Sequence, residues 1–152
     1  MQPNETILKT AHELALQAAR EDEVPVGAIV YHSQTKEIIS TCYNQTEKQK
    51  NPLAHAEILA IQKACQKLNV KRLTGYSLFV TLEPCTMCAG ALAWARLDGV
   101  FFGAFDPKTG AIKQGCKVFT HPQTHHKPII QGGFDAEKNG QILTDFFKQK
   151  RK

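Results

Sequence analysis

Two short segments of the chain contain side chains that bind transition metals. His55 and Glu57 place an imidazole and a carboxylate two residues apart, and Cys85 and Cys88 place two thiols at the C-x-x-C spacing. One histidine and two cysteines supply three protein ligands, which leaves one position of a tetrahedral zinc ion for water. A structural zinc site would need a fourth protein ligand. The spacing therefore predicts a catalytic zinc ion held by His55, Cys85 and Cys88.

Glu57 is predicted to be a proton shuttle and not a ligand. Residues two apart at the start of a helix point in different directions, so Glu57 can face the water while His55 faces the metal. Zinc lowers the pKa of a bound water toward ~7. Glu57 would then accept the proton of that water and return it to a ring nitrogen and a leaving amine.

Either half of this pattern alone has simpler explanations. A C-x-x-C pair is often a structural zinc site or a redox pair, and a His-x-Glu pair is common by chance. The two together, in this order, match the signature of zinc-dependent nucleobase deaminases. No second C-x-x-C pair or other ordered ligand cluster is nearby to close a structural site. The pattern favours attack by zinc-activated water on an amino-substituted heterocycle.

Alternating helices and strands must bring the two segments together. Apolar residues that repeat every three to four positions predict helices, and short continuous apolar runs predict strands. Strands that alternate with helices predict an α/β domain in which helices cover a mixed sheet. The predicted order is a helix over about 4–20, strands over 25–31 and 37–43, a helix marked by Ile58, Ile61, Cys65 and Leu68, a strand over 78–82, a helix from Thr86 to about Arg96, a strand over 99–103, a loop over 106–127, a short strand at 129–130 and a closing helix marked by Ile142, Leu143, Phe146 and Phe147.

Both halves of the motif lie where a strand or a loop leads into a predicted helix. The N-terminus of a helix carries a partial positive charge and free backbone N–H groups. That environment favours the thiolate forms of Cys85 and Cys88, which zinc binding requires.

The composition is that of a folded chain with an excess of positive charge. Of 152 residues, 42% are hydrophobic and 22% are charged, close to the globular average. Repeats, low-complexity segments and interdomain linkers are missing, so residues 1–152 are predicted to form one domain. The net charge of +5 suits a polyanionic partner. Four of the last five residues are basic, which suits such a partner or a solvated tail that complements the helix dipole: Lys148, Lys150, Arg151 and Lys152.

The sequence carries no signal for a membrane or for export. No apolar run approaches the length of a membrane span, and the segment Met1–Glu5 lacks the basic start and apolar stretch of a signal peptide. A cytoplasmic, reducing location is therefore expected. In that compartment a C-x-x-C pair indicates metal or redox chemistry before a disulfide.

Over nearly its whole length the chain resembles the bacterial tRNA-specific adenosine deaminases, which convert the wobble adenosine of an anticodon to inosine. The zinc motif is common to all the deaminase relatives, and the later segments favour the tRNA branch. The matching segments are Pro25–Ala28, Asn44, Ala54–Ile58, Thr81–Ala91, Phe102–Ala104, Asp106, Lys108–Ala111 and Asp145–Phe147.

The resemblance implies a three-layer α/β/α fold of the cytidine deaminase-like type, with a mixed five-stranded sheet. It implies one zinc ion per subunit, a tRNA anticodon stem-loop as substrate, and a homodimer whose active sites lie near the subunit interface. No membrane partner is expected. An anticodon loop already presents unpaired bases, which lowers the cost of moving a base into a zinc pocket.

By the same resemblance, four residues are candidates for contacts with RNA. Asn44 matches a position that hydrogen-bonds the flipped base, and Asp106 and Lys108 match a loop that meets the RNA near the target nucleotide. Phe147 is the better candidate for base contact in the aromatic pair of the last helix. As bare sequence, Asn44 is a turn residue, the segment around Asp106 is a good turn, and one or both rings of the aromatic pair are core.

The chain departs from the family at His125-His126, where the family often has Asn-His. The amide of that asparagine is therefore missing. His121 and His126 are predicted as candidate RNA contacts, because an imidazole can stack on a base. Histidines in a loop are more often simply exposed to solvent. The zinc motif is untouched by this departure.

Two other functions use the same motif. A deaminase of free guanine, cytosine or a nucleoside would share His55, Glu57, Cys85 and Cys88 but would need no basic tail. A zinc-stabilised RNA-binding module without activity is the other alternative. The presence of Glu57 argues against that module, because a structural zinc ion has no use for a proton shuttle.

Overall fold

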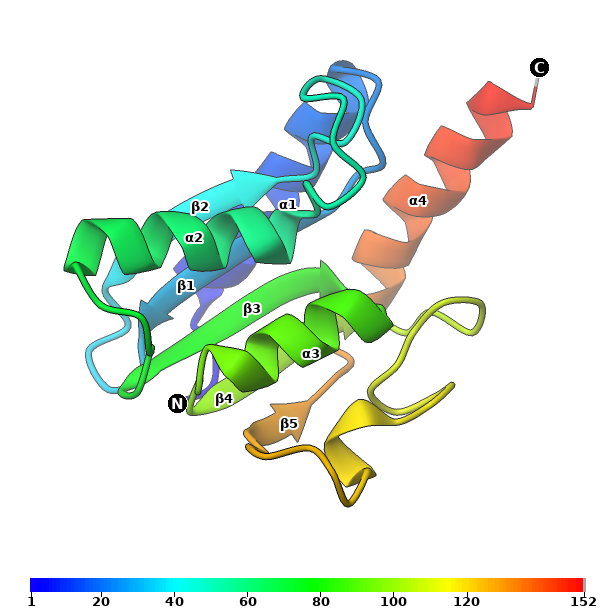
Figure 1. Ribbon diagram of the computed structural model, residues 1–152. Coiled ribbons are helices and arrows are strands. Elements are labelled where there is room, and N and C mark those ends of the chain that lie inside the picture. The colour runs from blue at the N-terminus through cyan, green and yellow to red at the C-terminus, as the bar shows by residue number, and fades with distance from the viewer. Residues whose placement is uncertain (152) are drawn as a thin grey trace.

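A five-stranded sheet lies between two layers of helices in the computed structural model, which describes residues 1–151 (Figure 1). The last basic residue of the predicted C-terminal run, Lys152, lies outside the described residues. The elements, in chain order, are α1 (Glu5–Arg20), β1 (Gly27–His32), β2 (Ile38–Tyr43), α2 (Ala56–Leu68), β3 (Tyr76–Leu82), α3 (Thr86–Trp94), β4 (Gly99–Ala104), the one-turn 3-10 helix η1 (Val118–Thr120), β5 (Ile129–Gln131) and α4 (Ala136–Lys150).

The sheet is mixed, with the strand order β2-β1-β3-β4-β5. β1 pairs antiparallel with both β2 and β3, whereas β3–β4 and β4–β5 are parallel pairs. Helices α2 and α3 cover one face, and α1 and α4 lie against the other (Figure 1). The predicted three-layer α/β/α arrangement with a mixed five-stranded sheet is thereby confirmed.

The central strands are mostly apolar because both of their faces are buried. Successive side chains of a strand point to opposite faces of the sheet. Val30 of β1 and Leu78 of β3 therefore pack toward α2 and α3, and their neighbours Ile29 and Phe79 pack toward α1. A strand covered on both faces has a continuous apolar run in place of an alternating one. That run is the signal by which these strands are predicted.

The predicted helices and strands are present, with small differences at their ends. β1 begins at Gly27 and not at Pro25, because proline has no N–H to donate to a neighbouring strand. α3 ends at Trp94, two residues earlier than predicted, and Arg96 adopts a positive φ of 60° that no α-helix contains. Helix α4 begins well before its apolar stripe. Within residues 1–151, no helix is both long and apolar enough to span a bilayer.

The two edges of the sheet are protected in different ways. At the β2 edge, lysines of α2 donate to backbone carbonyls, Lys63 Nζ to Thr41 at 3.4 Å and Lys67 Nζ to Ile39 at 3.4 Å. At the other edge, β5 is only three residues long. Unpaired edge groups are thus either covered by a charged side chain or few in number.

Candidate active site

The two predicted motif segments meet at one end of the sheet. β3 and β4 are parallel, so both finish there, and we call this the site end; the end where they begin is the far end. His55 directly precedes α2, and Cys85 directly precedes α3 as the N-cap residue, so both helices begin at the site end (Figure 1). The crevice beyond the carboxyl ends of parallel strands is where α/β proteins bind ligands.

His55, Cys85 and Cys88 form a cluster suited to a metal ion. Their ligand atoms all lie within 4.8 Å of one another, and they are the one such group of three found in residues 1–151. His55 Nδ1 lies 3.7 Å from Cys85 Sγ and 3.4 Å from Cys88 Sγ. A tetrahedral zinc ion with ordinary bond lengths separates nitrogen and sulfur ligands by about 3.6 Å. The three side chains therefore fit a zinc ion, with His55 Nδ1 as the nitrogen ligand.

The thiols of the cluster differ in acidity. A hydrogen bond from the Cys88 thiol, opposed by burial and helped by His55, lowers the pKa of Cys85 to about 4. The same hydrogen bond and burial raise the pKa of Cys88. The hydrogen bond to Cys85 raises the pKa of His55. One thiolate is thus already stable in the folded chain, and the thiolate is the form that binds metal.

Glu57 is the second residue of α2 and is almost completely buried beside the cluster, with 4% of its surface exposed. Burial raises the pKa of its carboxyl group to about 7. It is not a member of the three-residue ligand cluster. A carboxyl group with a pKa near neutrality can both accept and release a proton, as a general acid–base requires.

A cavity of about 250 Å³ opens beside Glu57 and the ligand cluster. Of the predicted RNA contacts, Asn44, Asp106 and Phe147 line it. Three of the lining residues, Asn44, Glu57 and Glu83, are buried polar groups. The full lining combines polar groups with an apolar wall: Val24, Val26, Asn44, Thr46, His55, Ala56, Glu57, Leu82, Glu83, Cys85, Asp106, Thr109, Leu143 and Phe147.

The other predicted RNA contacts lie outside this lining. Lys108 is exposed in the turn that follows Asp106, where its backbone N–H donates to the Asp106 carboxylate at 3.0 Å. His121 is exposed. His126 hydrogen-bonds the backbone carbonyl of Leu97 at 2.7 Å, beyond the C-terminal end of α3. The cavity thus brings together only some of the residues that the sequence singles out.

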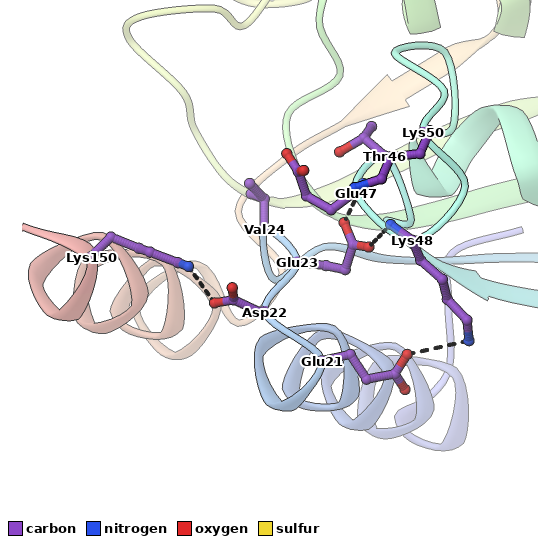
Figure 2. A pocket seen from close by; sticks show the side chains of 9 residues that line it. All are labelled: Glu21, Asp22, Glu23, Val24, Thr46, Glu47, Lys48, Lys50 and Lys150. Carbon is purple, nitrogen blue, oxygen red and sulfur yellow. Dashed lines mark hydrogen bonds and ion pairs between the residues drawn. The ribbon is translucent and has the colours of Figure 1, made fainter.

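The segment after β2 forms one wall of the cavity and is held by a buried glutamate. Glu23 is 1% exposed and accepts hydrogen bonds from the backbone N–H groups of Glu47, at 3.1 Å, and Lys48, at 2.7 Å (Figure 2). Asn44 and Thr46 belong to this segment and line the cavity. The backbone N–H of Asn44 donates to Val26 at 3.0 Å, which continues the pairing of β1 and β2.

Helix α4 forms another wall of the cavity. Leu143 and Phe147 line the cavity, and Phe147 keeps 46% of its surface exposed. Phe146 packs edge-to-face on Phe147 at 5.4 Å between ring centroids. One turn farther along, Lys150 pairs with Asp22 after α1 (Figure 2). Phe147 is therefore both accessible and directed to the site.

Sequence reasoning named no site role for four polar or α4 lining residues and for four apolar ones, and Glu83 is the most unusual of these eight. It is 2% exposed at the end of β3. Burial by itself raises the pKa of a carboxyl group, but hydrogen bonds from Asp106, Gln114, Lys113 and Ile112 hold the pKa of Glu83 below its usual value. An acidic residue that ends an apolar strand was the available signal. The other missed residues are Thr46, Thr109, Leu143, Val24, Val26, Ala56 and Leu82.

Comparison with known proteins places this chain among deaminases. A family model described as MafB19-like deaminase matches residues 3–151. A tRNA-specific adenosine deaminase of Rickettsia bellii is 43% identical over 134 residues, which cover 88% of this chain and 92% of that protein. One from Bacillus subtilis is 39% identical over 152 residues, covering 100% of this chain and 93% of that protein.

Solved structures give the same answer about the fold. A structure from a study of A-to-I editing by tRNA:A34 deaminases at the wobble position of transfer RNA superposes with a TM-score of 0.89 at 38% identity. It covers 92% of this chain and 100% of that one. A guanine deaminase from Bacillus subtilis superposes less closely, with a TM-score of 0.63 at 27% identity over 99% of this chain and 96% of its own.

Proposed function

The chain belongs to the tRNA-specific adenosine deaminase family and is a deaminase, and from this premise we propose that it converts adenosine to inosine at the wobble position of a tRNA anticodon. The proposal includes one zinc ion per subunit, bound by His55, Cys85 and Cys88. The observation that carries it is the placement of this ligand cluster and Glu57 beside one cavity. Residues 1–152 would act as one domain in the cytoplasm, where tRNA is found.

The chemistry divides between the metal and the chain. When bound, zinc supplies Lewis-acid activation of a water molecule at neutral pH. Glu57 takes a proton from the attacking water and returns it to the ring nitrogen and the leaving amine. Water adds at the carbon that bears the amino group, the C–N bond breaks, ammonia leaves and a carbonyl remains.

The cavity supports a single nucleobase as the group that enters. Its volume of about 250 Å³ lies below the range of about 300–1,000 Å³ that is usual for drug-sized ligands. A base must leave its stack to reach such a pocket. Asn44 would hydrogen-bond the edge of the base, and Phe147 would stack on it or on its neighbour.

The surroundings of the cavity support RNA as the larger substrate. Asp106 and Lys108 belong to a turn at its rim and would meet the nucleotides beside the target. Lys148 and Arg151 are exposed near the end of α4 and would attract phosphate. His121 and His126 stay predicted contacts for more distant nucleotides.

We also propose a homodimer. α3 carries no charged residue, and Trp94 at its end is 72% exposed. A Cβ atom built on Gly90 of the same helix meets nothing within 4 Å apart from its chain neighbours and the backbone of its own helix, so this part of α3 is open to a partner. Exposed apolar surface of this kind is typical of protein interfaces.

The test is inosine formation by purified, zinc-loaded protein on an anticodon stem-loop with a wobble adenosine. Free adenine, adenosine, guanine and cytosine are assayed in parallel, with Glu57→Gln as the blank. Conversion of the stem-loop alone, lost in the variant, is expected. If a free base is turned over and the stem-loop is not, the enzyme's substrate is a free base and not tRNA. A chain that binds the stem-loop but converts nothing would be a binding module.

A further inference from the structure

We propose that Glu83 is a positioning residue, which shapes the substrate-facing wall of the cavity by fixing the loop 106–114. The inference rests on the proposed function, because the substrate concerned is the nucleotide that enters this cavity. Glu83 contributes no chemistry to the reaction in this proposal. It acts through the residues of the loop.

Both carboxylate oxygens of Glu83 are occupied by this loop. Oε1 accepts from the backbone N–H of Asp106 at 3.0 Å and from Gln114 Nε2 at 2.9 Å. Oε2 accepts from the backbone N–H groups of Lys113 at 2.8 Å, Ile112 at 3.2 Å and Gln114 at 3.3 Å. Within residues 1–151 no cationic side chain pairs with Glu83. The loop's own N–H groups therefore balance its charge.

The same hydrogen bonds fix the residues that face the substrate. The Asp106 side chain accepts from the backbone N–H of Lys108 at 3.0 Å and from that of Thr109 at 3.1 Å. It also accepts from Thr109 Oγ1 at 2.6 Å. Asp106 and Thr109 both line the cavity. Because Glu83 holds the backbone of Asp106, one carboxylate sets the position of the whole turn.

The loop passes so close to Glu83 that position 110 has no room for a side chain. A Cβ atom added to Gly110 would lie 2.5 Å from Glu83 Oε1 and 2.5 Å from the carbonyl oxygen of Asp106. Only glycine allows this approach. Glu83 also lies two residues before Cys85, so the loop is fixed relative to the metal ligands through a very short stretch of backbone.

Glu83 determines the shape of the loop and not its attachment to the protein. Ala111 and Ile112 are buried, with 1% and 3% of their surfaces exposed. The backbone N–H of Ala111 also donates to Pro84 at 2.9 Å. These contacts remain when the carboxylate is changed. A Glu83 variant is therefore expected to fold and to keep the loop, with the turn from Asp106 to Gly110 less well fixed.

Glu83→Gln tests the proposal, with Asp98→Asn as the matched control. The amide keeps the size of the side chain but turns one acceptor oxygen into a donor, so one set of loop hydrogen bonds is lost. Asp98 also holds a turn, accepting from the backbone N–H of Gly75 at 3.0 Å and from Ser33 Oγ at 2.8 Å, but at the far end of the sheet. Its change makes the same chemical substitution away from the cavity.

The expected result is a KM for the anticodon stem-loop at least about tenfold higher in Glu83→Gln, with kcat changed less than KM and zinc content unchanged. Asp98→Asn should leave KM at the wild-type value. Loss of folded protein would lower the apparent kcat without moving KM. An unchanged KM in Glu83→Gln would overturn the proposal.

Hydrogen exchange provides a second measurement that does not depend on activity. Amides of the 106–114 loop should exchange faster in Glu83→Gln than in the wild-type protein, and at the wild-type rate in Asp98→Asn.

Gln114→Ala removes only one side-chain hydrogen bond to Glu83, so it should also raise KM, but by a smaller factor than Glu83→Gln. If the wild-type protein did not deaminate the stem-loop, the proposed function would fail, while hydrogen exchange would still test the role of Glu83. Wild-type exchange rates for the loop amides in Glu83→Gln would refute that role.

Discussion

The two ends of the central sheet use the same device for different purposes. At the far end, Asp98 accepts hydrogen bonds from Gly75 and Ser33, and Ser33 Oγ lies 2.9 Å from Ser77 Oγ. At the site end, Glu83 accepts five hydrogen bonds from an irregular loop. In both places an acidic side chain binds N–H or O–H donors where a cation is the more familiar partner.

The difference lies in what surrounds each anchor. The far end receives the ends of α2 and α3, and its acidic side chain, Asp98, joins the connection before β3, through Gly75, to the connection after β1, through Ser33. The site end receives the starts of both helices, with their free N–H groups and partial positive charge (Figure 1). The loop held by Glu83 becomes part of a site because it lies beside these helix starts at one cavity. An acidic side chain that holds a loop is thus found at both ends, whereas the helix starts with their metal-binding residues lie at the site end.

Removing a metal ligand at the site end should have the largest effect on activity. Cys88→Ala is expected to reduce deamination to background and to lower the zinc content, because two protein ligands hold zinc far less well than three. The matched control, Cys42→Ala, changes a buried cysteine of β2 outside the cluster. Cys42→Ala should keep its zinc and its activity. Elemental analysis measures the zinc content of each variant, and the inosine assay measures its activity. Full activity in Cys88→Ala would exclude the proposed metal site.

Glu57→Gln should leave the site assembled but inactive. Loss of a general acid–base typically costs about 10²–10⁴-fold in rate, and we expect kcat to fall at least about a thousandfold. Zinc content and stem-loop affinity should change little, since Glu57 is not in the ligand cluster. Single-turnover kinetics and a binding titration would check this. Retention of wild-type kcat would mean that another group moves the proton.

Phe147→Ala tests the wall formed by α4. Stacking of a base on an aromatic ring is worth about 1–3 kcal/mol, so KM for the stem-loop should rise about 5- to 150-fold. Phe146→Ala removes the neighbouring ring, which does not line the cavity, and should have a smaller effect. Equal effects of the two substitutions on KM would show that the pair acts through helix packing.

The far end should yield the smallest effect on activity. Asp98→Asn keeps one acceptor oxygen and loses one hydrogen bond, which is expected to lower the free energy of unfolding by about 1 kcal/mol. Urea unfolding measures this loss. We expect kcat and KM to stay at wild-type values. A large drop in kcat/KM would mean that the two ends of the sheet are coupled and that the far end contributes to the site.

The metal cluster could be predicted from the sequence because its geometry is local. Cys85 and Cys88 share one helical turn, and His55 precedes a second helix, so spacing alone restricts where the ligands point. The strands were predictable for a similar reason, since burial on both faces leaves continuous apolar runs. Helix α4 was harder, because its first turns from Ala136 are mostly polar and only Asn139 is buried in the helix.

The walls of the cavity could not be predicted because they depend on distant contacts. Glu83 finds its partners 23 to 31 positions away, and no local pattern indicates which loop will fold back onto it. Glu23 is a similar case, with partners 24 and 25 positions away. Leu143 joins the cavity only because α4 crosses the site end. These residues become visible when the topology of the sheet is known.

The lysines along the β2 edge also bear on how the protein behaves at high concentration. An uncovered edge strand is a template for strands of other chains and a common start of aggregation. Lys63 and Lys67 occupy two carbonyls of that edge, and the three-residue β5 offers little at the other. Strand addition is therefore disfavoured at both edges. The protein should stay dispersed while it is being synthesised in crowded conditions, and chains that do associate should do so through their helices.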